Sequence, residues 1–369
     1  MVASNLLSYY FQMMHLPTKF IALSAVTLLM ITTNSCTTLT YYEHSISGHL
    51  EIMQKSRPIE TILQQKNISS ELRTSLQQVM EIRKFASAVL FLPDNRSYSS
   101  YADLGRIYVV WNVVATPEFS LEPLNWCYLV VGCLTYRGYF SKAEAATYAQ
   151  VLQAEGYDVN IAGVTAYSTL GWFADPVINT MLRYDSIFLA RVIFHELAHQ
   201  LFYFADDTEF NEAFADTVAE YGVKCWLKDN NMMKDLMEFE QTLAGEKAFN
   251  QLIFKYKIKL EDLYHSTMNT NEMRQQKQII FDTLHRDYDQ LHTSWPDPED
   301  YAAWFNTGIN NAKLALVLTY KDLVPSFYEI LSRGNYDLRQ FYRTVGRLAE
   351  CDKTTRRQVL ASNLLNFNC

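Results

Sequence analysis

The chain has 369 residues, of which 49% are hydrophobic and 20% are charged, with a formal net charge of −8 at pH 7. This balance is typical of a folded globular protein and excludes an intrinsically disordered chain. The acidic charge argues against nucleic acid as a partner, and the length allows one or two domains with a large hydrophobic core.

The N-terminus carries the features of a secretory signal. Lys19 precedes an apolar run over residues 20–31, which is too short for a comfortable membrane span, and small or polar residues follow it. Cys36 stands where a bacterial lipoprotein is cleaved and lipidated, although Thr33 takes the place usually held by Leu. We predict a signal peptide over residues 1–35 and a lipid on Cys36, with an ordinary signal peptide or an uncleaved anchor as the alternative.

The rest of the chain, residues 36–369, is expected to form a single unit. Apolar residues at helical spacing predict helices first, in residues 37–90. A β-containing part over about 91–180 follows, then two helices over about 186–227, and then a helical part over about 228–369. This order predicts an α+β fold that is mostly helical, with a small mixed β-sheet before the central helices.

The β-containing part combines several strand-like runs with one helix. The runs cover residues 107–115, 126–133, 135–140 and 158–162, and the helix covers residues 142–155. Residues 166–170 follow as a candidate edge strand or loop, where an extended peptide could pair by β-augmentation.

The cysteines after Cys36 allow two disulfides. Cys127 and Cys133 are close enough in sequence to join two strands, and Cys351 with Cys369 is a second pair that an oxidising compartment permits. Buried free thiols are the alternative. No Cys-x-x-Cys stretch occurs, so a cysteine-based metal site is not expected.

The pattern His-Glu-x-x-His is formed by His195, Glu196 and His199. The surrounding apolar periodicity, without Gly or Pro, predicts that it lies on a helix that Asp185 or Ser186 caps. Residues four apart share one helix face, so both imidazoles can point at one metal ion. Glu196 is then placed to act as a general base toward water.

A third metal ligand is expected from the next helix. Glu212 follows His199 by 13 residues, which allows one helix to end and a second to return beside it. Asp216 lies four residues further on the same face and is placed to accept the second N–H of a ligand imidazole. Glu209 and Glu220 compete for the ligand role, although solvated surface is the expectation for both. Glu-x-x-x-Asp after His-Glu-x-x-His resembles the thermolysin-like glutamate-zincin arrangement.

The C-terminal part begins with a charged helical hairpin over residues 228–295, which has one solvated face. Asn310 and Asn311 precede an apolar helix and are expected to cap it, with a hydrogen bond to a peptide backbone as the alternative. The expected helices cover residues 235–243, 246–256, 270–291, 324–331 and 337–348.

Further stretches spread along the chain carry a family resemblance. They cover residues 98–105, 110–115, 117–123, 136–140, 166–173, 193–200, 210–215, 310–312 and 341–342. Together these stretches resemble the predicted zinc aminopeptidase family of Gram-negative bacteria, over nearly all of the chain after Cys36. The resemblance implies a zincin-like metallopeptidase fold, a bound Zn²⁺, and a lipoprotein start.

These observations predict a zinc peptidase of the cell envelope, an aminopeptidase by resemblance, lipid-anchored at Cys36 and facing the periplasm, with peptides as substrates. Glu196 is the predicted catalytic base. Tyr167 is a candidate to polarise the scissile carbonyl, with an ordinary core role as the alternative. The competing hypotheses are a non-catalytic envelope protein that keeps the metal for structure or partner binding, and a latent enzyme whose cleft is covered by its own chain.

Overall fold

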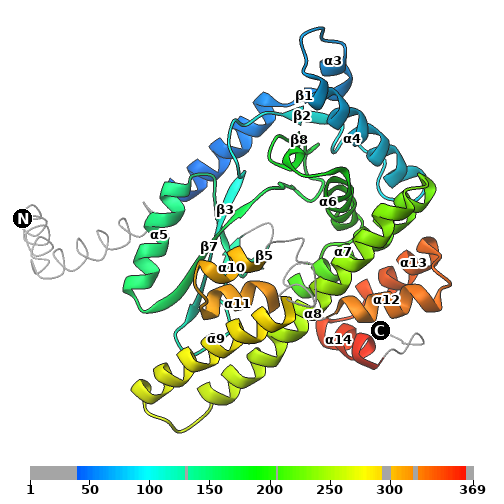
Figure 1. Ribbon diagram of the computed structural model, residues 1–369. Helices are drawn as coiled ribbons and strands as arrows, with labels where there is room; N and C mark the ends of the chain where they lie inside the picture. Colours follow the sequence, from blue (N-terminus) through cyan, green and yellow to red (C-terminus); the bar gives the residue numbers. More distant parts are fainter. Residues whose placement is uncertain (1–39, 129–131, 205–206, 293–300, 319–322, 363–369) are drawn as a thin grey trace, which may run out of the picture. The chain divides into compact units, whose positions relative to one another are not determined.

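The computed structural model describes residues 40–128, 132–204, 207–292, 301–318 and 323–362, which are the coloured parts of Figure 1. The chain divides into two compact units, Met1–Glu51 and Ile52–Cys369. A helix covers residues 40–55, while the predicted signal peptide and Cys36 lie outside the described residues. Within these ranges, no helix combines the length and the apolar character needed to cross a membrane.

The predicted α+β class is confirmed, because helices dominate and the strands form only small sheets. The helices of the second unit are α3 (Ile59–Leu63), α4 (Ser70–Ala88), α5 (Lys142–Ala154), α6 (Ser186–His199), α7 (Thr208–Asp229), α8 (Met233–Tyr264), α9 (Thr270–His292), α10 (Tyr301–Asn306), α11 (Asn311–Leu318), α12 (Val324–Arg333), α13 (Leu338–Ala349) and α14 (Lys353–Ser362). A short 3-10 helix, η1 (Met181–Arg183), precedes α6.

The strands of the described residues form three small sheets. The first is mixed: β2 (Ser100–Ala102) pairs antiparallel with β1 (Arg57–Pro58) and parallel with β8 (Val177–Ile178). The second is antiparallel and has the order β6 (Arg137–Tyr139), β3 (Val110–Pro117), β7 (Tyr157–Val164). The third is a pair formed by β4 (Trp126–Tyr128) and β5 (Gly132–Leu134). The β-containing part thus supplies strands to separate sheets, in place of the single sheet expected.

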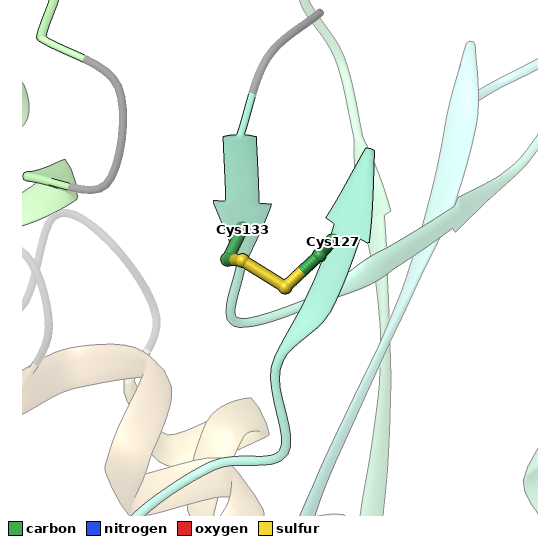
Figure 2. The surroundings of a disulfide bond; sticks show 2 residues. All are labelled: Cys127 and Cys133. Carbon is green, nitrogen blue, oxygen red and sulfur yellow. A yellow bond between two sulfur atoms is a disulfide. The ribbon is translucent and has the colours of Figure 1, made fainter. Parts of the chain in front are cut away.

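A disulfide joins the third sheet across its two strands. Cys127 on β4 and Cys133 on β5 are directly opposed in the ladder, and Figure 2 shows their sulfur atoms bonded between the strands. This pairing is confirmed. The second expected pair, Cys351 with Cys369, falls on a residue outside the described part of the chain.

α4 packs into the main core and carries one buried cation that contacts the segment after the helix. Ser69 caps α4 by accepting a hydrogen bond from Leu72 N at 3.1 Å. Arg83, near the end of α4, donates to the carbonyl oxygens of Pro93, Asn95 and Ser97. A buried guanidinium needs such partners, and these fix the turn that leads into β2.

α6 packs closely against α7 (Figure 1). This packing brings the predicted site residues of the two helices together. Gly222 on α7 makes this approach possible, because an added Cβ would lie 3.0 Å from a ring carbon of Phe194 and 2.6 Å from Leu90 Cδ1. The shared core is rich in aromatic side chains, since Phe194, Phe210 and Phe214 are fully buried in it.

The predicted helical hairpin is confirmed as α8 and α9, which pack along each other (Figure 1). They form a second hydrophobic core together with Leu121, Phe305 of α10 and Leu314 of α11. α8 is continuous over 32 residues, although two helices were expected there. Gly245 favours a break by propensity, but it is buried within α8, where packing outweighs its local preference.

Candidate metal centre

α6 carries the His-Glu-x-x-His pattern near its C-terminal end. Asp185 caps the helix by accepting a hydrogen bond from Phe188 N at 2.8 Å, as the sequence predicts. His195 and His199 lie one turn apart on this helix; His195 is partly exposed, whereas His199 is buried with the core residues of α6.

The structure brings His195, His199 and Glu212 together. The two Nε2 atoms are 3.0 Å apart, and the Glu212 carboxylate lies 3.3 Å from His195 Nε2 and 3.7 Å from His199 Nε2. One ligand atom from each residue lies within 4.8 Å of the others. In the described part of the chain, this group of three residues is the one set of candidate ligands close enough to share an ion.

The start of α7 is fixed by two separate contacts, which sets where Glu212 lies. The Asn211 amide accepts from Phe204 N at 2.9 Å and donates to Phe204 O at 2.8 Å, so it holds the segment that leaves α6. Asp207, fully buried as a side chain, accepts from Arg356 and Arg357 of α14. Both sets of contacts lie just before Glu212 and fix the backbone at the start of α7.

Asp216 contacts His195 and is not one of the three candidate ligands. Its Oδ1 lies 3.0 Å from His195 Nδ1, on the ring edge away from Glu212. A carboxylate there accepts the Nδ1 proton, which leaves the Nε2 lone pair free and directed at the other two ligands.

The donor set suits a cation. Three atoms with lone pairs face one point, and His199 Nδ1 is buried with no hydrogen-bond partner among the described residues. Two imidazoles and one carboxylate are ligands that zinc and similar divalent metals accept, and a site with three protein ligands leaves a place for water or substrate. The residues present therefore fit such an ion.

The electrostatics of the site also favour added positive charge. Burial alone would lower the pKa of His195, but its hydrogen bonds and charge interactions with Asp216 and Glu212 raise that pKa well above its ordinary value. Burial opposes ionisation of Glu212, yet His199 and His195 lower the Glu212 pKa well below its ordinary range. The cluster holds a negative field that a proton or a metal ion can neutralise.

Glu196 lies half-buried beside this cluster, next to His195 on α6. Tyr98 and Asp175 are fully buried near Glu196. The negative charge of Glu196 contributes to raising the pKa of both side chains. Burial raises the pKa of Asp175 to about 6, and the charge of Glu196 adds to that increase.

Tyr167 lies in the loop after β7 and contacts the main core. Its ring centroid is 5.8 Å from that of Phe140, and burial raises its pKa above the ordinary value, with a further increase from Asp175. Its catalytic role stays a prediction. The candidate edge at residues 166–170 is a loop, and the strand before it ends at Val164.

The competing carboxylates point elsewhere. Glu209 pairs with Arg357 at 2.5 Å. Glu220 lies 3.4 Å from Arg191 and is buried, so the solvated position expected for it is wrong. The asparagines of the C-terminal part serve structure. Asn310 caps α11 through Lys313 N at 2.9 Å, as predicted, and the Asn311 amide is occupied by Tyr264 and by the backbone of Glu118.

Arg191 was given no role by the sequence reasoning, although it precedes His195 by four residues on one face. Its guanidinium donates to both carboxylate oxygens of Glu246, at 2.6 and 2.9 Å, and the charge of Asp216 also acts on it. The four-residue spacing between Arg191 and His195 was the one sequence feature that indicated a position beside the site. The partner on α8 is 55 residues away, which no local pattern reveals.

Comparison with known protein families matches residues 40–360 to the family described as "Putative aminopeptidase". The match covers most of the chain, so the chain belongs to this family, and its description indicates a peptidase that acts on peptides. Searches of curated proteins and of solved structures find no match.

Proposed function

We propose that this protein is a zinc-dependent peptidase, an aminopeptidase by family, that works in the cell envelope of a Gram-negative bacterium. The observation that supports the proposal most directly is the convergence of two imidazole nitrogens and a Glu212 carboxylate, with Glu196 next to His195 on the same helix. Three protein ligands plus an adjacent acid are typical of hydrolytic sites, whereas structural zinc sites use four protein ligands.

The chain's own residues have distinct roles in this proposal. His195, His199 and Glu212 hold the ion, which when bound supplies Lewis acidity for a water nucleophile and for the substrate carbonyl. Glu196 accepts the proton of the attacking water and delivers it to the leaving amine. Asp216 keeps a proton on His195 Nδ1, so the Nε2 lone pair stays available to the ion.

Residues 1–36 supply the proposed location. A signal peptide ending before Cys36, with a lipid on that residue, places the enzyme on the periplasmic side of a membrane. Radiolabelled palmitate incorporation into the wild type and into Cys36→Ser tests this part separately. Labelling of both proteins, or of neither, contradicts the lipid anchor.

Metal analysis together with a peptide-library digest tests the activity. Purified protein should contain about one zinc per chain and cleave peptides, with mass spectrometry reading the cut positions. Stepwise loss of N-terminal residues supports aminopeptidase action, and internal cuts contradict it. Glu196→Gln should retain the zinc and lose turnover by about 10²–10⁴-fold, the usual contribution of a general base. Undiminished hydrolysis by that variant contradicts the proposed mechanism.

A further inference from the structure

The loop between β7 and β8, residues 165–176, presents two adjacent aromatic side chains to solvent. Trp172 is 73% exposed and Phe173 is 52% exposed. Large aromatic side chains usually bury most of their surface, so a neighbouring pair this exposed marks a surface for binding.

Asp175 holds this loop from inside the protein. Its carboxylate accepts hydrogen bonds from Thr169 N and Thr169 Oγ1, both at 2.8 Å, while its backbone oxygen accepts from Tyr98 N at 2.6 Å. Thr169 Oγ1 in turn accepts from Phe173 N at 3.0 Å. The aromatic pair therefore sits on a backbone that is fixed by a fully buried carboxylate.

The turn before the pair is fixed as well. Leu170 and Gly171 have φ of +55° and +83°, and Trp172 N donates to Thr169 O at 3.1 Å. A leucine with positive φ is strained and persists only where its surroundings hold it. A Cβ on Gly171 would lie 3.3 Å from Gln200 Cγ, so the loop rests against the Gln200 side chain.

Gln200 connects the loop to the metal centre. It directly follows His199 and forms the C-cap of α6. Its amide is held on both sides, since Asn95 Nδ2 donates to its Oε1 at 2.7 Å and its Nε2 donates to Ser97 Oγ at 3.3 Å. Trp172 is therefore one residue from a glycine that touches the end of the helix bearing the histidines.

We propose that Trp172 and Phe173 form a binding surface for an apolar side chain of the peptide substrate, next to the bond that is cut. The inference rests on the proposed function and deepens it. A preformed aromatic surface binds with little loss of conformational entropy, which is how rigid aromatic anchors contribute affinity and selectivity. Residues 165–176 contain no Lys or Arg, the residues that accompany aromatic side chains at an anionic membrane surface.

Peptide binding to the Glu196→Gln protein, measured by titration calorimetry, tests the surface without requiring turnover. The probes are two hexapeptides that differ only in having Leu or Ser at the N-terminal residue, and a second pair that differs at the next residue. Adding Trp172→Ala and Phe173→Ala should weaken binding of one Leu peptide about tenfold and leave its Ser counterpart unchanged. Replacing Trp172 by Phe instead, with Phe173 unchanged, should keep most of the affinity for the Leu peptide.

Phe254→Ala is the matched control, because Phe254 is an aromatic residue of α8 that is 43% exposed. It should change no affinity. Equal weakening of Leu and Ser peptides, no weakening, or no binding of any peptide overturns the inference. Turnover by the wild-type protein is measured in parallel. If the wild type cleaves peptides while the binding result is negative, the inference fails and the proposed function stands. Vesicles of phosphatidylglycerol and phosphatidylcholine provide a second test. Binding of these vesicles to the Glu196→Gln protein, but not to the protein that also carries Trp172→Ala and Phe173→Ala, overturns the inference in favour of a membrane contact.

Discussion

His195 Nδ1 lies 3.0 Å from Asp216 Oδ1, across the contact between α6 and α7. The same ring faces Glu212 with its other nitrogen, at 3.3 Å. One helix face of α7 thus supplies both the carboxylate of the candidate ligand set and the carboxylate that contacts the far nitrogen of the imidazole. This division of labour explains why a four-residue spacing recurs on both helices.

Replacing Asp216 should weaken metal binding without removing a ligand. In Asp216→Asn the carboxylate that accepts the Nδ1 proton becomes a neutral amide, so the orientation and basicity of His195 fall. We expect the affinity for zinc to drop about 10–100-fold, as for other residues that orient metal ligands. Competition with a chromophoric chelator measures this affinity. Asp229→Asn, at the end of α7, is the control and should bind zinc as the wild type does.

Replacing Glu212 should have a larger effect on the metal than any other acid of α7. Glu212→Gln removes the charged ligand and leaves two histidines, so we expect zinc affinity to fall by more than the Asp216 variant shows, about 100-fold or more. Glu209→Gln loses only the pair with Arg357 and should keep its zinc. Metal content after dialysis, measured by atomic emission, compares the two. Retention of zinc by Glu212→Gln contradicts the ligand assignment.

The sequence predicted the local parts of this site because its signals are local. The spacing of apolar residues predicted α6, and Asp185 was predicted as its cap. The 13 residues between His199 and Glu212 predicted a second helix that returns beside the first. Long-range relationships were not predictable in this way. Arg191 meets Glu246 across 55 residues, and nothing in the local sequence distinguishes Glu246 from the exposed acids around it.

The sheets show the same limit. Strand-like runs were located by composition, but which strand pairs with which depends on tertiary packing. β8, two residues long, pairs with β2 across 76 residues (Tyr101 with Val177) and could not be found from alternation. Asp175, three residues after Trp172, reads as part of a turn in sequence, and only the structure shows that it is fully buried near Glu196.

Asp175 should make stability depend on pH between about 4 and 6. Burial raises its pKa from 3.8 to about 6 in the folded protein, so the unfolded chain releases this proton at lower pH than the folded one. Stability from this group is present below pH 4 and is lost as the pH rises through 6, by roughly 3 kcal/mol. Asp175→Asn, which cannot ionise, should remove this dependence.

Urea unfolding from pH 4 to 7.5, with a chelator present, gives the free energy of unfolding for both proteins. The difference between wild type and Asp175→Asn cancels the titration of the histidine cluster. A difference that stays constant over this range shows that Asp175 ionises normally in the folded protein.

The Arg191–Glu246 pair should stabilise the contact between α6 and α8. Both side chains are mostly buried, 19% and 8% exposed, so Glu246→Gln leaves a guanidinium with a weakened partner in a dry site. We expect the free energy of unfolding to fall by about 3 kcal/mol, as when one member of a buried ion pair is removed. Glu329→Gln breaks the exposed pair with Arg333 and should cost at most about 0.5 kcal/mol. Equal losses in urea unfolding of these two variants contradict a structural role for the buried pair.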